Sequence, residues 1–170
     1  MNISSEKPMD FILEDSMGKL LKWLRILGFS AVLARELQPA SAEKAFGAPK
    51  TVYLTRSRMQ PLTKQGPRIG IQADRVFDQL REVIQASCIT REHLRPFSRC
   101  IHCNAIIEDI DKDCVQGRVP DYVFATHTKF KCCPLCRRIF WQGTHAQKIN
   151  AVIDRLLSSP SGQPELPNSD

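Results

Sequence analysis

The sequence contains no apolar run that approaches the roughly 20 residues a helix needs to span a membrane. Its first residues, MNISSEKPMD, also lack the apolar core of a secretory signal. Without an export signal, the seven cysteines are expected in a reducing compartment, which favours metal binding over a disulfide framework. The odd cysteine count also argues against complete pairing. We therefore expect a cytoplasmic protein with no membrane partner.

Acidic residues are fewer than basic ones, 18 against 24, and the net charge is +6. This modest excess permits an anionic partner such as RNA, although solubility alone would also account for it. The hydrophobic content of 42% supports an ordinary core and excludes a disordered chain. At 170 residues the chain has room for one domain, or for a domain with a small module.

The stretch from Phe11 to Gly28 predicts a buried strand that runs directly into an amphipathic helix. The run FILE is apolar until its last residue, so Glu14 and Asp15 are expected at the carboxyl end of the strand. From Met17 onward, apolar residues recur at intervals of three and four, which is typical of one helix face. Gly28 is the expected helix end, since glycine readily adopts the left-handed conformation that closes a helix.

Short apolar runs and helical patterns alternate along the first part of the chain. Further strands are expected at 30–34, 51–55 and 68–72, with helices at 42–46 and 75–86. This alternation predicts an α/β fold with a mostly parallel sheet that helices cover on both sides.

Two CxxC pairs, Cys100–Cys103 and Cys133–Cys136, dominate the second part of the chain. A tight turn within each pair lets four thiolates surround one ion, and this closed shell predicts a structural Zn²⁺ site. The pairs are farther apart than usual, so we expect a hairpin to bulge out between them. Redox dithiols or unrelated thiols are the alternative, and Cys132 is a competing ligand with the wrong spacing for a knuckle.

These patterns divide the chain into four segments. We expect an α/β domain at 1–95, a zinc ribbon at 96–145, a closing helix at 146–158 and a disordered polar tail at 159–170.

Three stretches together resemble one family. FILEDSMGKLLKWLRILGF is similar to its motif F-L-V-D-x-M-L-G-K-L-A-R-W-L-R-x-L-G-Y, and TVYLTRSR is similar to R-x-L-L-T-R-D-R. SRCIHCNAII and FKCCPLCRRIFWQGTHAQKI resemble its zinc ribbon, F-x-x-C-P-x-C-G-R-x-Y-W-x-G-S-H. The family is the Mut-seven C-terminal RNase domain, and the resemblance implies a three-layer, PIN-like nuclease fold with a small zinc ribbon.

The resemblance also implies a reaction, which is hydrolysis of RNA by Mg²⁺ or Mn²⁺ held among carboxylates at strand ends. Glu14 stands where the family has its first aspartate, and Ser57 stands where a later aspartate is expected. After the second strand only Glu36 and Glu43 are acidic, and neither lies clearly in register. We therefore expect a degenerate acidic site in which Glu14 and Asp15 are the catalytic candidates.

Basic residues near this edge form the expected RNA-binding set, which comprises Lys19, Lys22, Arg25, Arg56 and Arg58. The first three form a stripe on the predicted helix, which is either a solvated face or a path for phosphates. Three functions stay open: a metal-dependent ribonuclease, a weakened or inactive relative that binds RNA, and a zinc-stabilised protein-interaction module.

Several candidate residues also have structural interpretations. Asp15 and Asp74 are suited to cap the helices that follow them. Trp23 is expected to be core or half-buried. Phe140 and Trp141 are expected to pack between the ribbon and the main domain, with base stacking as the alternative.

Overall fold

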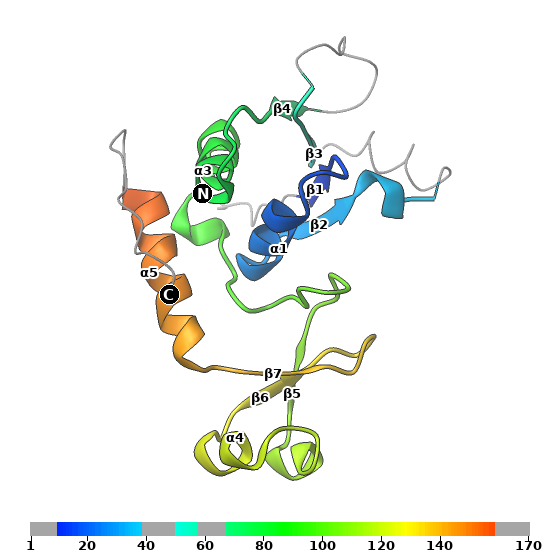
Figure 1. Cartoon of the computed structure of the whole chain (residues 1–170), viewed down its shortest axis with the longest axis vertical. Coiled ribbons are helices and arrows are strands. Elements are labelled where there is room, and N and C mark those ends of the chain that lie inside the picture. Colours follow the sequence, from blue (N-terminus) through cyan, green and yellow to red (C-terminus); the bar gives the residue numbers. More distant parts are fainter. Residues whose placement is uncertain (1–9, 39–49, 58–66, 159–170) are drawn as a thin grey trace, which may run out of the picture.

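The computed structural model describes residues 10–38, 50–57 and 67–158 (Figure 1). Arg58, Glu43, the short helix predicted at 42–46 and the tail at 159–170 lie outside the described residues. The strands are β1 (Asp10–Leu13), β2 (Ser30–Leu33), β3 (Thr51–Thr55), β4 (Arg68–Gly70), β5 (Glu108–Ile110), β6 (Phe130–Cys132) and β7 (Ile139–Trp141). The helices are α1 (Gly18–Ile26), α3 (Val76–Ala86), α4 (Asp121–Thr126) and α5 (Thr144–Ser158), with 3₁₀ turns η1 (Ala34–Glu36), η2 (Arg91–His93) and η3 (Lys112–Val115).

The first four strands form a parallel sheet in the order β2-β1-β3-β4, which confirms the α/β prediction. Strand β1 lies between β2 and β3, and its register pairs Leu13 with both Leu33 and Leu54. The three strands therefore end together. Residues that follow them, such as Glu14, meet at one edge of the sheet.

Helices α1, α3 and α5 share one hydrophobic core with the sheet. Phe11 of β1 contacts Phe29 edge-on at a centroid distance of 5.4 Å. Trp23 of α1 is half-buried, as expected, and its ring lies 5.0 Å from that of Phe77 on α3. Ile153 brings the closing helix α5 into the same core. Among the described helices, none combines the length and apolarity of a membrane span.

Gly28 ends α1 as the sequence predicted, with a positive φ of 97°. A Cβ atom at this position would lie 2.3 Å from the carbonyl oxygen of Arg95. The chain that leaves the α/β unit is bound here, because the amide of Arg95 donates to the carbonyl of Leu27 at 2.9 Å. Only glycine permits both this backbone conformation and this close approach.

The second sheet is antiparallel, with the order β5-β6-β7. The second cysteine turn joins β6 to β7, and the first lies before β5, between the bridged residues Arg99 and Ile106. The bulge expected between the cysteine pairs is helical rather than a plain hairpin, because η3 and α4 fill it (Figure 1). Val115, Val119 and Val123 recur at intervals of four and pack on Phe130 as a small separate core. The boundaries of the ribbon at 96 and 145 stay a prediction.

Candidate metal centre and nucleic-acid interface

The Sγ atoms of Cys100, Cys103, Cys133 and Cys136 all lie within 4.8 Å of one another. Cys103 and Cys133 are 3.2 Å apart, and Cys100 and Cys136 are 3.6 Å apart. A tetrahedral zinc ion with Zn–S bonds of about 2.3 Å would place its sulfurs roughly 3.8 Å apart. The donor set therefore fits one zinc ion with no coordination position left open.

The two cysteine turns are built alike. In each, the amide of the first cysteine donates to a carbonyl five residues later, from Cys100 to Ala105 at 2.8 Å and from Cys133 to Arg138 at 3.0 Å. Because both knuckles repeat one backbone pattern, they present their thiols symmetrically to a shared ion. Cys132 is buried beside the second knuckle but lies outside the quartet.

The residue after each knuckle adopts a left-handed conformation, with φ of 66° at Asn104 and 60° at Arg137. Asparagine tolerates this region, but an arginine there is unfavourable by about 1–2 kcal/mol. The family motif has glycine at the position of Arg137. This chain therefore keeps the knuckle geometry with a less suitable residue.

The acidities of Cys100, Cys133 and Cys136 are shifted in different directions. Burial raises the pKa of Cys100 to about 12 and also raises the pKa of Cys133. Hydrogen bonds from Arg138 lower the pKa of Cys136 to about 6. A metal that binds here therefore has to displace protons from the buried Cys100 and Cys133 thiols.

The acidic edge of the sheet contains both predicted acids, and each binds backbone. Glu14 Oε2 accepts from the Thr55 hydroxyl at 3.0 Å and from the Arg56 amide at 2.7 Å. Asp15 Oδ1 accepts from the Arg35 amide at 3.1 Å. The expectation that Asp15 caps α1 is wrong, since Met17 occupies the N-cap without a side-chain bond. The two carboxylates thus connect the end of β1 to the ends of both neighbouring strands, Glu14 to β3 and Asp15 to the turn after β2.

Within the described ranges, the cysteine quartet is the only group of three or more side chains placed to share a metal ion. Ser57, at the position of a family aspartate, is exposed, and its amide donates to the Thr55 hydroxyl at 3.0 Å. Glu36 forms an ion pair with Arg25, with 3.6 Å between Oε2 and Nη2. No third described carboxylate joins Glu14 and Asp15.

Arg56, a predicted RNA-binding residue, forms an ion pair with Asp74 at 2.6 Å. This pair replaces the predicted capping role of Asp74, because Arg75 is the N-cap residue of α3. Sequence reasoning missed Glu82, whose carboxylate accepts from the amides of Gln72 and Ala73 at 2.9 and 3.0 Å. The only sequence signal was an acid on the helix that follows β4.

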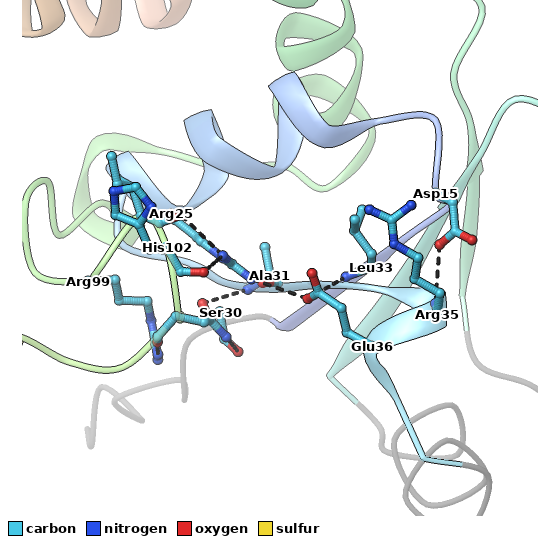
Figure 2. Close-up of polar contacts among 11 residues, drawn as sticks. Asp15, Arg25, Ser30, Ala31, Leu33, Arg35, Glu36, Arg99 and His102 are labelled. Carbon is cyan, nitrogen blue, oxygen red and sulfur yellow. Dashed lines mark hydrogen bonds and ion pairs between the residues drawn. The ribbon is translucent and has the colours of Figure 1, made fainter. Parts of the chain in front are cut away.

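In the predicted basic stripe on α1, Lys19 and Lys22 are exposed and their RNA-binding role stays a prediction, whereas Arg25 is buried. Arg25 is only 3% exposed. Its Nε donates to the Ala31 carbonyl at 2.8 Å, so the side chain points toward β2 and away from solvent (Figure 2). Burial lowers the pKa of Arg25, while Glu36 raises it.

Arg25 also binds the first zinc knuckle. Its Nη1 donates to the carbonyl of Ile101 at 3.1 Å. The same atom donates to the carbonyl of His102 at 2.8 Å (Figure 2). The Asn104 side chain makes a second connection, accepting from the Ala31 amide and donating to the Ser30 hydroxyl, both at 3.1 Å. These contacts join residues more than 70 positions apart, so no local pattern could have indicated them.

The aromatic pair after the second knuckle divides between two environments. Phe140 packs against the cysteine cluster inside the ribbon, and not between the ribbon and the main domain. Trp141 is 39% exposed. Cys88 and Cys114 are exposed thiols outside the metal-ligating quartet.

A parallel four-stranded sheet with its helices, joined to a four-cysteine cluster consistent with a zinc ribbon, defines a mixed α/β fold of the class that the sequence resemblance implied. The family model described as the Mut7-C RNAse domain matches residues 9–153, and the chain belongs to this family. The resemblance seen in the sequence is therefore confirmed. Comparison with curated proteins and with solved structures gives no match.

Proposed function

We propose that this protein is an RNA-binding member of the Mut7-C RNAse family in which the acidic edge serves structure and not hydrolysis. The observation that carries the proposal is the engagement of Glu14, whose Oε2 binds both the Thr55 hydroxyl and the Arg56 amide. Both bonds fall on Oε2 and hold the side chain toward β3, and among the described residues no group of three or more carboxylates forms here to enclose a hard divalent cation. Ser57 contributes no carboxylate at this edge.

Zn²⁺ has a structural role in this proposal. Cys100, Cys103, Cys133 and Cys136 would hold the ion and stabilise the two knuckles. A shell of four thiolates leaves no position for a water nucleophile. Such a site requires reduced cysteines, which supports a cytoplasmic location.

RNA binding is supported by the family, by the net charge of +6 and by the exposed Lys19 and Lys22. Fluorescence anisotropy with a labelled single-stranded RNA tests it directly. The affinity should fall with salt, and Lys19→Glu with Lys22→Glu should reduce the salt slope by about 0.7 for each phosphate that the variant no longer neutralises. Absence of binding at low salt would rule out this function.

Metal-dependent RNA hydrolysis is the second candidate. It is favoured by one observation, that Glu14 and Asp15 lie at the carboxyl end of the central parallel strand, where α/β folds place their sites. Incubation of labelled RNA with Mn²⁺ or Mg²⁺ distinguishes the two candidates. Cleavage that disappears in Glu14→Gln would establish hydrolysis, whereas intact RNA in a salt-sensitive complex supports the binding function.

A further inference from the structure

We propose that helix α1 and the zinc ribbon present one continuous phosphate-binding surface, which the buried Arg25 assembles. The surface consists of Lys19 and Lys22 on α1 with His102 and Arg138 on the ribbon, and its ligand is the backbone of single-stranded RNA. This inference rests on the proposed RNA-binding function and assigns it a location.

The helix side of this surface follows from spacing. Lys19, Lys22 and Arg25 are three residues apart, so they lie along one side of α1. The two lysines are exposed, whereas Arg25 turns inward and binds the backbone carbonyl of His102 at 2.8 Å. The lysine stripe therefore continues directly into the first zinc knuckle.

The ribbon side follows from how the knuckles meet. Cys100 and Cys136 bring the two turns together, with 3.6 Å between their Sγ atoms. His102 lies in the first turn and Arg138 two residues after the second, and both are exposed. The ribbon thus carries a cation next to the knuckle on which Arg25 is docked.

The two sides meet at the first knuckle. Arg25 Nη1 donates to the carbonyls of Ile101 and His102 at 3.1 and 2.8 Å, and Cys136, two residues before Arg138, lies against Cys100. Glu36, 3.6 Å from Arg25, offsets the buried cation and leaves Lys22 and Arg138 as the exposed ones.

A polyanion is the ligand that this arrangement suits. Exposed cations held together repel one another, and a phosphate backbone relieves that repulsion while releasing its own counterions. The family favours RNA over an acidic peptide as the source of the negative charge.

The first experiment compares charge reversals of equal size. Lys22→Glu and Arg138→Glu should each weaken binding of single-stranded RNA about tenfold and reduce the salt slope. Lys148→Glu and Arg155→Glu, at exposed positions on α5, are the controls and should change the affinity less than about twofold. Zinc content confirms that Arg138→Glu keeps its metal, and if it does not, Lys22→Glu alone decides. Test variants indistinguishable from the controls would overturn the proposal.

The second experiment isolates the role of Arg25. Arg25→Met removes almost no surface charge, because the side chain is 3% exposed, yet it should weaken RNA binding at least fivefold. When Arg138→Glu is added to Arg25→Met, it should reduce the affinity for RNA much less than it does in the wild type, since the ribbon is no longer held beside α1. An equal cost in both backgrounds would contradict assembly by Arg25.

Asn104→Gly provides the same test if Arg25→Met does not fold. Glycine keeps the left-handed backbone and removes the side-chain bonds to Ala31 and Ser30. The failure modes are separable. A wild-type protein that binds no RNA overturns the proposed function as well, whereas RNA binding that ignores Lys22 and Arg138 overturns only this surface. Binding of poly-glutamate in place of RNA would contradict RNA as the ligand.

Discussion

The guanidinium of Arg25 donates to three backbone carbonyls, one on β2 and two in the first zinc knuckle. Such a planar fork of donors suits several fixed acceptors at once, whereas a lysine ammonium is a compact point charge. At the scale of the single residue, this side chain joins the α/β core to the ribbon. The helical pattern of the sequence does not distinguish a buried arginine from an exposed one. Only the tertiary structure shows the backbone carbonyls that accept hydrogen bonds from Arg25.

Arg25→Lys should therefore destabilise the zinc-loaded protein by about 2 kcal/mol, because at least one buried carbonyl loses its donor. Urea denaturation followed by circular dichroism measures the change. Lys22→Met, three residues away and exposed, should stay within about 0.5 kcal/mol of the wild type. Equal stabilities for the two variants would show that the Arg25 contacts contribute nothing.

Gly28→Ala should lower the free energy of unfolding by more than about 2 kcal/mol. The new Cβ would lie 2.3 Å from the Arg95 carbonyl oxygen, and the backbone φ of 97° is unfavourable for alanine. Gly18→Ala is the matched control. A Cβ there contacts nothing within 4 Å at the first residue of α1, so helix propensity should raise stability by up to about 1 kcal/mol. Thermal unfolding of both variants is informative, and a stable Gly28→Ala protein would refute the close approach.

Arg137→Gly should stabilise the protein by up to about 1 kcal/mol, since glycine adopts the φ of 60° at this position without steric cost. Arg138→Gly is the control at the next position. Arg138 does not have a positive φ, so glycine there should destabilise the protein. The midpoint of urea unfolding for the zinc-loaded variants reports both effects. A loss of stability in Arg137→Gly would mean that the arginine side chain itself supports the knuckle.

At the scale of elements, the metal centre depends on two turns that come together from distant parts of the chain. Zinc affinity should rise with pH between 6 and 8, because protons on Cys100 and Cys133 compete with the metal. Each displaced proton contributes about tenfold per pH unit. Near pH 6 the thiolate of Cys136 also begins to protonate, since its pKa is about 6, which weakens binding further.

Competition titration with a chromophoric chelator measures this dependence, and calorimetry in two buffers counts the protons released. Cys132→Ser is the control, because Cys132 lies outside the quartet and should leave the zinc stoichiometry at about one per chain. Affinity that does not vary with pH would contradict the protonated state of the buried thiols.

Most regular elements could be predicted from the sequence because their signals are local. The run 51–55 matches β3 at both ends, and α3 and α5 lie within two residues of their expected bounds. The helical insertion with η3 and α4 was missed, since its few apolar residues form a separate small core that only the tertiary structure completes. The sequence predicted that Asp15 and Asp74 cap helices, but each carboxylate binds another group. Asp15 accepts from the Arg35 amide, and Asp74 pairs with Arg56.

At the scale of the whole molecule, the chain belongs to the Mut7-C family, and its two edge carboxylates bind backbone donors of neighbouring strand ends. The metal-ligand spacing was readable in the sequence because each CxxC pair is a local motif. The docking of the ribbon was not, because it depends on Arg25, Asn104 and acceptors more than 70 residues away. The same docking brings helix α1, which carries Lys22, to the first zinc knuckle and connects the fold to its proposed ligand.

The central claim is that the protein binds RNA through this surface and leaves it intact. The most direct measurement incubates the zinc-loaded protein with end-labelled single-stranded RNA and Mn²⁺, and analyses each sample on native and denaturing gels. We expect a salt-sensitive complex on the native gel and full-length RNA on the denaturing gel, with Glu14→Gln behaving as the wild type. Mn²⁺-dependent fragments that disappear in Glu14→Gln would contradict this account.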